Sequence, residues 1–522
     1  MPGYVFLFLL LGIFTLPAAS TAWSGEKASL LLPYADTPTS SLWDRATDLT
    51  APYRERAALE RALLARGVEA RTLLQKKLET GRPLERQVAA RLLGRAGDPG
   101  DEALLLRAAS DPHPLVREHA AHALALLYQK IPPEGRLERL EGDSSDSRAA
   151  ALQALALSCL GARLGGVDPS SSLSKDWSAP SQAAGPKACP ISREEALALL
   201  DRLQDADPLV KLAAAEACAA CALCEAFRSL WDAASLAKLR NDLGGLLAGD
   251  PQARTRLSAC SALNRMIPSE RASFEGARKD PEAEVRYAAL AALAKRGDSS
   301  ALDALHRALE EADPSLRLQA LAALSECANP FSEGPVAGLL ADPSPRVRME
   351  AAQALGGLPG PGITPGLHEL LNDPDPRVRT EAAVALDRQG ALGIARRVLP
   401  DLKRPEAPFR AEAARALGLL GAPEAVAPLA ACARDADLDV ACNAVEALGR
   451  ISLTVDAAVE SLLLALRDPR GAVSSEAALA LGRKTGLPFD RDPAGALSAW
   501  RAKESGKFAV PAEVLGKKAG KK

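Results

Sequence analysis

A repeat with a constant period between residues 280 and 482 constrains this chain more than any other feature. Each copy opens with an apolar residue, usually followed by Arg, and continues as a stretch rich in Ala and Leu. The copies start at residues 285, 316, 347, 378, 409 and 440, so that successive starts differ by 31. A constant period of this size is typical of a helix pair stacked on copies of itself, because one pair alone leaves its apolar face exposed. The sequence therefore predicts an all-α fold of the α-solenoid class.

The copy around residue 375 indicates why each repeat should contain a second, longer helix. Asp375 is suited to cap free backbone amides, and Pro376 follows at the first helical position, where its missing N–H removes no hydrogen bond. Apolar or small residues then recur at Val378, Ala382 and Leu386, which lie on one face of a helix. The sequence therefore predicts that the turn is followed by a helix with one buried face.

A shorter amphipathic stretch precedes each turn, as in residues 363–371 and 425–432. Each repeat is therefore expected to be a helix, an Asp/Pro turn and an Ala-rich helix. We expect left-handed glycines to end the second helix of several copies. These glycines are Gly356, Gly418, Gly449 and Gly482.

The pattern D-P-x-x-x-V-R-x-x-A-A-x-A-L-G is nearly complete from Asp342 to Gly356 and recurs in degenerate form elsewhere. This pattern resembles the HEAT repeat family, in particular the short bacterial HEAT-like repeats of the phycobilisome-lyase type. The resemblance implies a superhelix of about eleven or twelve stacked helix pairs. HEAT-like repeats serve scaffolds, regulators and occasional enzymes, so the resemblance leaves the function open.

Charge and composition limit the classes of partner. The chain has 64 basic and 66 acidic residues, so it carries no global positive field that would hold nucleic acid. Aromatic residues are only 4% of the chain, so the interior must consist mainly of Ala and Leu. We therefore expect no nucleic-acid partner and a thin core in which helices pack closely.

Residues 1–22 are expected to be a signal peptide. The apolar stretch 5–16 has the length of a signal h-region and is too short for an ordinary membrane span. Small residues up to Ala22 supply a cleavage point before Trp23. An uncleaved N-terminal anchor is the alternative, because residues 1–3 contribute no Lys or Arg. We predict an exported protein, periplasmic or secreted, with no membrane span after signal removal.

The rest of the chain divides by composition and by the quality of the repeats. The insertion is rich in Gly, Ser and Pro, which is typical of a loop. Phe489 and Trp500 are expected to cover the last repeat, whose outer apolar face has no neighbour. The expected segments are a leader or linker at 23–52, N-terminal HEAT-like repeats at 53–160, a loop insertion at 161–190, the main array at 191–482, a C-terminal cap at 483–502 and a loose basic tail at 503–522.

Cysteines and histidines are the residues most suited to chemistry. Cys218, Cys221 and Cys224 follow one another at intervals of three, so adjacent pairs share a helix face. We favour small buried residues in the place of alanine, with a local disulfide or a metal site as alternatives, although a metal site lacks a fourth ligand. His119 and His122 are also three apart, and we interpret them as part of a polar helix face.

No catalytic motif is present in the sequence. It has no Gly-rich phosphate loop, no nucleophile elbow and no H-E-x-x-H motif. HEAT-like metal hydroxylases, which resemble this fold, carry repeated His-Glu pairs, whereas this chain has one, His368-Glu369. We therefore expect no catalytic, cofactor-binding or metal-binding residues.

Two functional hypotheses follow from these observations. The first is a non-enzymatic scaffold, a monomer, that binds another protein or peptide on its curved surface. The second is a lyase-like or chaperone-like protein that grips a cofactor or a modified substrate.

Charged residues recur in two columns along the second helices. At 100° per residue, Arg379 and Glu381 lie on opposite sides of the buried stripe, so that each faces a neighbouring repeat. We predict that these columns form ion pairs between repeats, or hydrogen bonds to turn carboxylates, with a structural role. The columns are Arg286, Arg317, Arg348, Arg379 and Arg410, and Glu350, Glu381, Glu412 and Glu476.

A further column, one residue after each of these arginines, is the candidate partner site. Its members in the middle of the array are apolar, and an apolar row left bare would cost solubility. A groove for a segment of another protein is one interpretation. The alternative is that the superhelix buries the row against the first helices. The candidates are Tyr287, Leu318 and Met349 from this column and Val384 from the column four residues further on.

Overall fold

The structure is a computed structural model with helices as its only regular elements in the part of the chain that it describes. The all-α prediction is therefore confirmed. The signal peptide predicted at 1–22 and the tail at 503–522 lie outside the described residues, as do most of the insertion at 161–190 and of the cap at 483–502. The described residues are 34, 37–163, 190–357, 365–451, 456–487, 489 and 496.

The described residues form two compact units. Unit 1 runs from Arg71 to Asn329, and unit 2 combines the residues before Arg71 with those from Pro330 onward. The described part of the chain therefore begins in unit 2, passes into unit 1 within helix α4 (Val68–Thr80) and returns to unit 2 after helix α18 (Pro314–Cys327).

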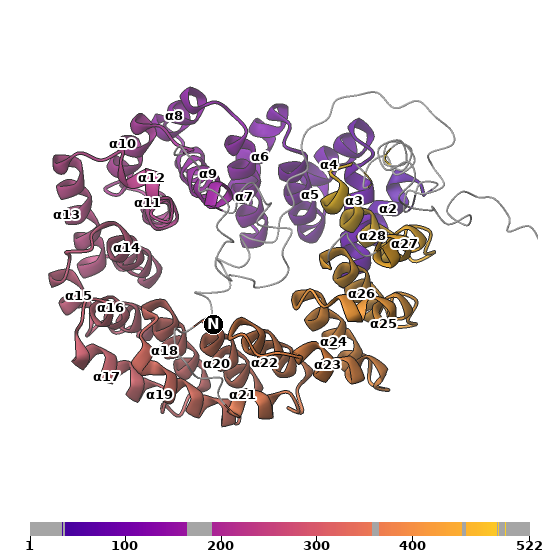
Figure 1. Cartoon of the computed structure of the whole chain (residues 1–522). Coiled ribbons are helices and arrows are strands. Elements are labelled where there is room, and N and C mark those ends of the chain that lie inside the picture. The colour runs from indigo at the N-terminus through magenta and orange to yellow at the C-terminus, as the bar shows by residue number, and fades with distance from the viewer. Residues whose placement is uncertain are drawn as a thin grey trace, which may run out of the picture. The chain divides into compact units, whose positions relative to one another are not determined.

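Unit 1 is a stack of helix pairs. Its second helices pack on one another in chain order, and each of them from α7 onward also packs on the first helix of its own pair. In Figure 1, first helices α13, α15 and α17 lie along one side of the unit, and second helices α14, α16 and α18 along the other. The first helices are α6 (Glu102–Ala109), α8 (Pro133–Glu141), α10 (Arg193–Arg202), α13 (Ala233–Gly249), α15 (Ala272–Ala277) and α17 (Ser299–Ala308), with the short α12 (Glu225–Arg228) between two pairs. The second helices are α5 (Pro83–Ala96), α7 (Pro114–Gln129), α9 (Ser145–Arg163), α11 (Pro208–Cys221), α14 (Ala253–Met266), α16 (Ala283–Lys295) and α18.

Unit 2 repeats the same arrangement with shorter first helices, several of which are extended by 3-10 turns. The first helices are α2 (Thr39–Ala46), α19 (Glu333–Gly338), α21 (Pro365–Leu370), α23 (Ile394–Val398), α25 (Val426–Cys432) and α27 (Asp456–Ala465). The second helices are α3 (Tyr53–Leu64), α20 (Pro345–Gly357), α22 (Pro376–Arg388), α24 (Ala407–Leu419), α26 (Leu438–Arg450) and α28 (Gly471–Thr485).

The second helices begin as the sequence predicts. The Asp375 carboxylate accepts a hydrogen bond from the backbone N–H of Arg377 at 2.8 Å, and Pro376 is the first helical residue of α22. Asp313 and Asp207 cap α18 and α11 in the same way. The cap satisfies a backbone N–H that has no partner within the helix, so the turn and the helix start are fixed locally.

The glycines near the helix ends have a different role from the predicted one. Gly356, Gly418, Gly449 and Gly482 lie inside their helices and do not adopt positive φ, so the prediction of left-handed stops is wrong. A Cβ atom at Gly418 would lie 2.7 Å from both Cα and Cβ of Ala447 in the next second helix. Three of these glycines therefore permit close approach of neighbouring helices, as found at Gly356, Gly418 and Gly449.

The core is thin and consists mainly of alanine and leucine, as the composition predicts. Close helix packing replaces bulky side chains, since few aromatic residues are available. The largest fully buried side chains are Trp43, Tyr128, Phe227, Phe274 and Phe489.

One described helix, α2, precedes the N-terminal repeats that the sequence predicts at 53–160. Helix α2 lies within the predicted leader at 23–52, and its Trp43 side chain is buried. Helix α2 packs on α3, and α3 packs on α28 in the way that α28 packs on α26. The N-terminal pair thus follows α27 and α28 in the stack of unit 2.

Polar contacts join α3 to the last repeats. Arg54 donates from Nε to an Asp439 carboxylate oxygen at 3.1 Å, and Arg61 donates from Nε to the Ser475 hydroxyl at 2.8 Å. Phe489, a member of the predicted cap, is fully buried, whereas Trp500 lies outside the described residues. The outer face of the last described repeat is therefore covered by α3. Within the described ranges, no helix has the length and apolar character needed to span a membrane.

Candidate functional site

The structure places the predicted partner-binding residues mostly inside the stacks. Tyr287 and Val384 are 6% and 7% exposed, and Leu318 and Met349 are half-buried. Tyr287 and Leu318 belong to unit 1, whereas Met349 and Val384 belong to unit 2. Because neighbouring second helices approach closely, they leave little of this column in contact with solvent. In neither unit do these residues form a bare apolar row, and partner binding by them stays a prediction.

Several of the repeated arginines form hydrogen bonds to two successive turns. Arg348 donates from Nε and Nη2 to the two carboxylate oxygens of Asp373 at 2.8 and 2.9 Å, and from Nη1 to the carbonyl of Asp342 at 2.8 Å. Asp342 lies in the turn of the arginine's own repeat, and Asp373 lies in the turn of the next repeat. One side chain therefore ties two successive repeats. The same paired contact is made by Arg86 with Asp111, Arg148 with Asp205, Arg256 with Asp280 and Arg410 with Asp435.

Two other arginines of the predicted column bind turn carbonyls. Arg286 donates to the carbonyls of Asp280 and Pro281, both at 2.7 Å. Arg317 donates to the carbonyls of Glu311 and Ala312 at 2.8 and 3.0 Å.

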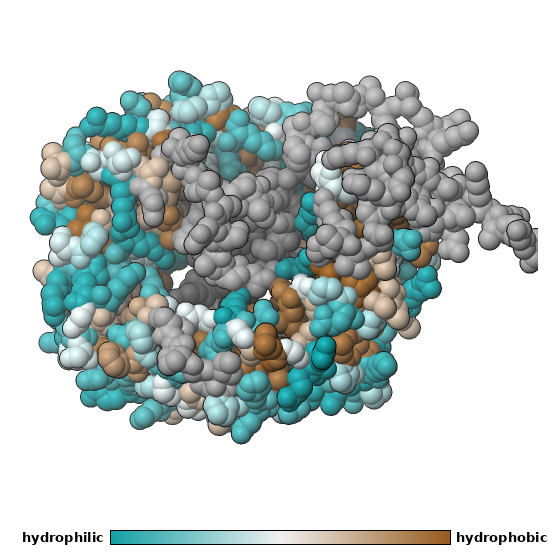
Figure 2. Space-filling model, in the orientation of Figure 1, coloured by the Kyte–Doolittle hydropathy of each residue, from teal (hydrophilic) through white to brown (hydrophobic). Residues whose placement is uncertain are grey.

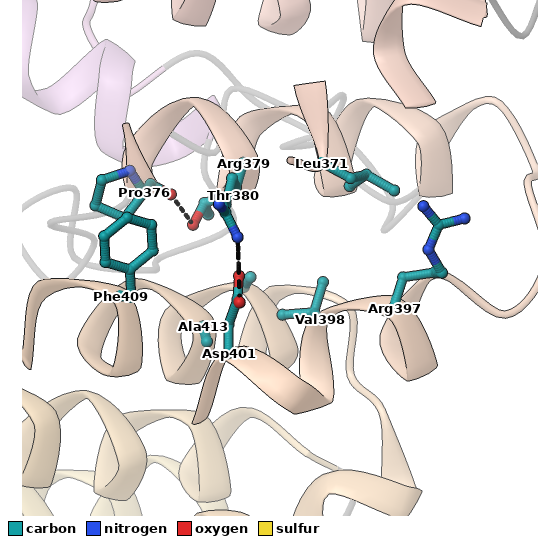
Figure 3. A pocket seen from close by; sticks show the side chains of 10 residues that line it. Leu371, Pro376, Arg379, Thr380, Arg397, Val398, Asp401, Phe409 and Ala413 are labelled. Atoms are coloured by element: carbon teal, nitrogen blue, oxygen red, sulfur yellow. Dashed lines mark hydrogen bonds and ion pairs between the residues drawn. The ribbon is translucent and has the colours of Figure 1, made fainter. Parts of the chain in front are cut away.

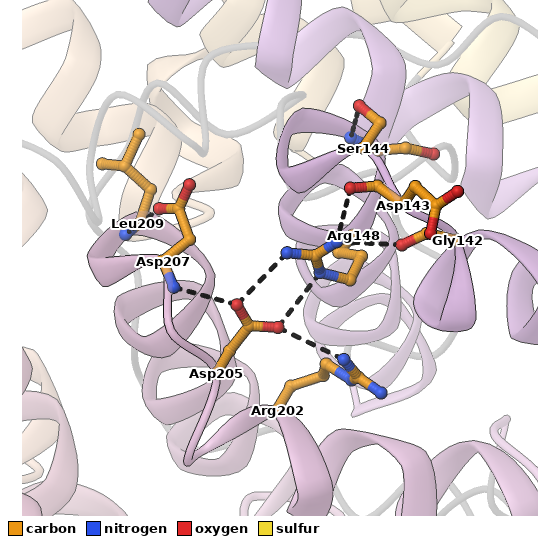
Figure 4. A network of polar contacts seen from close by, with 9 residues as sticks. Gly142, Asp143, Ser144, Arg148, Arg202, Asp205, Asp207 and Leu209 are labelled. Carbon is orange, nitrogen blue, oxygen red and sulfur yellow. Dashed lines mark hydrogen bonds and ion pairs between the residues drawn. The ribbon is translucent and has the colours of Figure 1, made fainter.

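Figure 4 shows one of these junctions in unit 1. The Asp205 carboxylate accepts hydrogen bonds from Arg148 at 3.0 and 3.2 Å, from Arg202 at 3.3 Å and from the backbone N–H of Asp207 at 3.0 Å. A single carboxylate therefore joins the preceding repeat, its own first helix and its own turn.

Hydrogen bonding from arginine changes the acidity of several turn carboxylates. The hydrogen bonds from Arg410 lower the pKa of Asp435, and those from Arg86 lower the pKa of Asp111. Charged donors stabilise the ionised carboxylate, so these two groups resist protonation in the folded state.

Figure 3 shows the junction around Arg379. Arg379 donates from Nη1 to both Asp401 carboxylate oxygens at 2.9 and 3.1 Å, and it lies over the Phe409 ring. The adjacent cavity has a volume of 10 Å³, which is room for about one water molecule. The junction is thus filled by protein and offers no ligand site.

The glutamate column also makes contacts between repeats. Glu381 lies 3.1 Å from Arg415 of the next second helix, and Arg415 donates to Glu412 at 2.8 Å. Glu476 lies 3.7 Å from Arg483 within its own helix. Glu350 is half-buried on α20.

The cysteine group lies inside unit 1. Cys218, Cys221 and Cys224 are buried, and burial raises the pKa of the Cys218 thiol. The Cys221 thiol donates to the carbonyl of Leu155 at 3.7 Å. Cys189, which lies in the insertion, is outside the described residues. These contacts fit small buried side chains packed against the neighbouring helix.

Two of the histidines lie on α7. His119 on α7 makes its hydrogen bond to its own helix, at 2.8 Å from the Leu115 carbonyl, and burial lowers the pKa of His122 to about 4. His368 is half-buried and Glu369 is exposed on α21. Within the described ranges, no group of three or more His, Cys, Asp or Glu residues is placed to hold a metal ion.

A groove that sequence reasoning missed lies between first helices α25 and α27. It has a volume of 350 Å³. An arginine directly before the turn aspartate of two consecutive repeats, in Arg434-Asp435 and Arg467-Asp468, is the signal that would have found it. The lining residues are Ala430, Ala431, Ala433, Arg434, Ser461, Leu464, Ala465, Arg467 and Asp468.

The chain is similar in fold to several solved structures. The structure of Kap95p with RanGDP is 15% identical, has a TM-score of 0.37, and the match covers 90% of this chain and 70% of that one. Importin beta is 14% identical with a TM-score of 0.39, and the match covers 91% and 72%. Human deoxyhypusine hydroxylase is 24% identical with a TM-score of 0.21, and the match covers 47% and 96%.

Comparison with protein families gives a match along several segments of the chain. No curated protein matches the chain. The family model of HEAT repeats matches residues 70–156, 271–331, 332–404 and 395–482. Because the matched segments cover more than half of the chain and coincide with the stacked helix pairs, this protein belongs to the HEAT repeat family.

Proposed function

We propose that this protein is a non-enzymatic, exported scaffold that binds another protein or peptide along its second helices. The observation that carries the proposal is the column of positions five residues after the repeated basic position. Most of these positions carry half-buried polar side chains, whereas Ala291, Ala322 and Val384 in the same column are apolar. Polar side chains on several successive repeats suit an extended partner that lies across these helices, as in other solenoid proteins. The column includes Arg91, His122, Gln153 and Glu216 in unit 1, and Gln353, Arg415 and Glu446 in unit 2.

The surface composition supports a polar recognition surface. In the view of Figure 2, hydrophilic residues cover much of the described surface and separate the apolar patches from one another. Polar and charged groups at an interface favour selectivity and rapid association more than raw affinity.

Recovery of the partner and measurement of its affinity test the proposal. The tagged full chain is used to capture proteins from the native host, and each recovered protein is purified and titrated by calorimetry. We expect one protein to bind the wild-type chain and to bind the variant His122→Ala/Gln153→Ala/Glu216→Ala at least about tenfold more weakly. The control variant, Glu134→Ala/Glu138→Ala/Glu141→Ala, changes exposed residues of first helix α8 and should bind normally.

If the recovered partner bound both variants with equal affinity, the second helices would not be the binding surface. A chromophore or metal bound to the purified chain would favour the lyase-like or chaperone-like alternative.

Export is the second part of the proposal and rests on the apolar stretch 5–16 and the small residues before Trp23. N-terminal sequencing of the protein from its native host should give a chain that begins at Trp23. Intact Met1 in a cytosolic fraction would contradict export without affecting the proposed binding.

A further inference from the structure

The groove between α25 and α27 is lined in part by small side chains, so a segment of another protein could lie close to the two helices. These two helices are the first helices of consecutive repeats, and they pack against each other within unit 2 (Figure 1). Four alanines and Leu464 form the apolar part of its lining. Its 350 Å³ falls at the lower end of the range of about 300 to 1,000 Å³ found for binding pockets. Small side chains leave room for apolar groups of a partner.

Two arginines line the same groove. Arg434 follows the end of α25, and Arg467 follows the end of α27. Both side chains are exposed, and neither guanidinium has an ion-pair partner in the part of the chain that the structure describes. Asp468 also lines the groove, but Arg470 already binds its carboxylate through two hydrogen bonds of 2.8 and 2.9 Å. The groove therefore combines an apolar lining with two uncompensated positive charges.

Among the repeats of unit 2 from Pro330 onward, only these two have an arginine at this position. The corresponding residues of the earlier repeats are Ala341 and Asn372, which carry no charge, and Lys403, which is also basic. A cation at a helix C-terminus is weakly favoured by the helix dipole, which accounts for either arginine singly. The helix dipole does not explain why both arginines line the same groove.

We propose that this groove binds a short segment of a protein partner that carries small apolar side chains and two carboxylates. The proposal rests on the protein-binding function proposed above and specifies the chemistry of the bound segment. Apolar side chains of the segment contact the alanines and Leu464, and its carboxylates pair with Arg434 and Arg467. Guanidinium and carboxylate groups form strong paired hydrogen bonds, whereas a basic segment would be repelled.

Selection from a display library of short random peptides tests the proposal. The full chain is immobilised, and enriched peptides are synthesised with a fluorescein label and titrated by fluorescence polarisation. We expect the enriched peptides to contain Asp or Glu beside Ala, Val or Leu. Arg434→Glu/Arg467→Glu should weaken their binding by roughly tenfold or more, because two charged hydrogen-bonded pairs become repulsive. Ala431→Trp should also weaken binding, because it fills the groove from an exposed position.

The matched control is Arg377→Glu/Arg396→Glu. Both of these arginines are exposed, have no side-chain partner among the described residues, and lie outside the groove. The control makes the same change in net charge and should leave the Kd unchanged. Circular dichroism of each variant verifies that the helices are intact.

The groove assignment would be overturned by the absence of any enriched peptide, by enriched peptides without carboxylates, or by acidic peptides that bind the Arg434→Glu/Arg467→Glu variant as well as the wild type. A native partner that binds this variant normally would refute the groove and leave the proposed scaffold function standing. Loss of binding to both the Arg434→Glu/Arg467→Glu variant and the matched control would show a non-specific charge effect and would likewise refute it.

Discussion

Arg410 shows how a single side chain connects two repeats. Its Nη1 donates to the carbonyls of Arg404 and Pro405 in its own turn at 2.9 and 2.7 Å. Its Nε and Nη2 donate to the two carboxylate oxygens of Asp435 in the next turn, both at 2.9 Å. Because both partners are largely shielded from solvent, such a contact contributes more than an exposed ion pair.

Replacement of Arg348 by alanine should destabilise the junction between α20 and α22. The substitution leaves the buried Asp373 carboxylate without its charged donor, and we expect a loss of about 2 kcal/mol. Hydrogen exchange of the two helices and the thermal midpoint measure the loss. Arg377→Ala, at an exposed position on α22, is the control and should change neither. Equal stability of the two variants would refute the structural role of the arginine column.

Acid should weaken the junctions at Asp111 and Asp435. Their pKa values are lower in the folded chain than the value of about 3.9 in an unfolded chain. The stability that they contribute is therefore complete above this unfolded pKa and is lost as the pH falls through the folded pKa. Helix content followed from about pH 6 to about pH 2 should decline below about pH 4. Asp435→Asn should show a smaller loss of stability with acid, and an unchanged acid profile would contradict this account.

Alanine at Gly418 should disturb the packing of α24 on α26. The added Cβ would overlap Ala447, and relief of the overlap must separate two closely packed helices. We expect a loss of roughly 1–3 kcal/mol. Gly245→Ala on α13 is the matched control, because nothing lies within 4 Å of its Cβ position. This control should instead gain up to about 1 kcal/mol of stability, because alanine has a higher helix propensity than glycine.

At the scale of elements, the N-terminal pair α2 and α3 is held to the last repeats of unit 2. Trp43 anchors α2 with only 1% of its surface exposed, and α3 covers α28. A repeat at the end of a solenoid otherwise leaves its apolar outer face in water. The first described helices therefore serve as the cover of the last described repeat.

Trp43→Ala should consequently weaken two regions that are far apart in the sequence. The cavity should cost about 3–5 kcal/mol, and hydrogen-exchange protection should fall in α2, in α3 and also in α28. Leu49→Ala, at a residue that is 65% exposed, is the control. Unchanged protection in α28 would show that the N-terminal pair does not stabilise the last repeat.

At the scale of the whole molecule, the free energy of unfolding should be a sum of contributions from individual repeats and from the junctions between neighbouring repeats. Each described repeat packs on its neighbours in the stack, so a perturbation at one junction reaches few other elements. Arg148→Ala in unit 1 and Arg348→Ala in unit 2 should therefore add within about 0.5 kcal/mol in the double variant. Hydrogen exchange should fall only around the altered junction in each single variant. A general loss of protection in both units would contradict nearest-neighbour stability.

The sequence by itself determined the features that depend on neighbours along the chain. The period of 31, the Asp375 cap with Pro376, and the apolar stripe of the second helix predict the helix pair and its stacking, because each is set within one turn or one helix. The family resemblance rested on the same local pattern, and the match to HEAT repeats confirms it.

Only the tertiary structure decided the features that depend on residues far apart in the chain. Gly418 looks like a helix stop in sequence, yet it matters because Ala447 of another helix lies against it. The cover of α28 by α3 joins two ends of the sequence that share no local signal. The burial of Tyr287 and the groove beside Arg434 likewise arise from the spacing of neighbouring helices, which the packing of the assembled stack sets and no single repeat encodes.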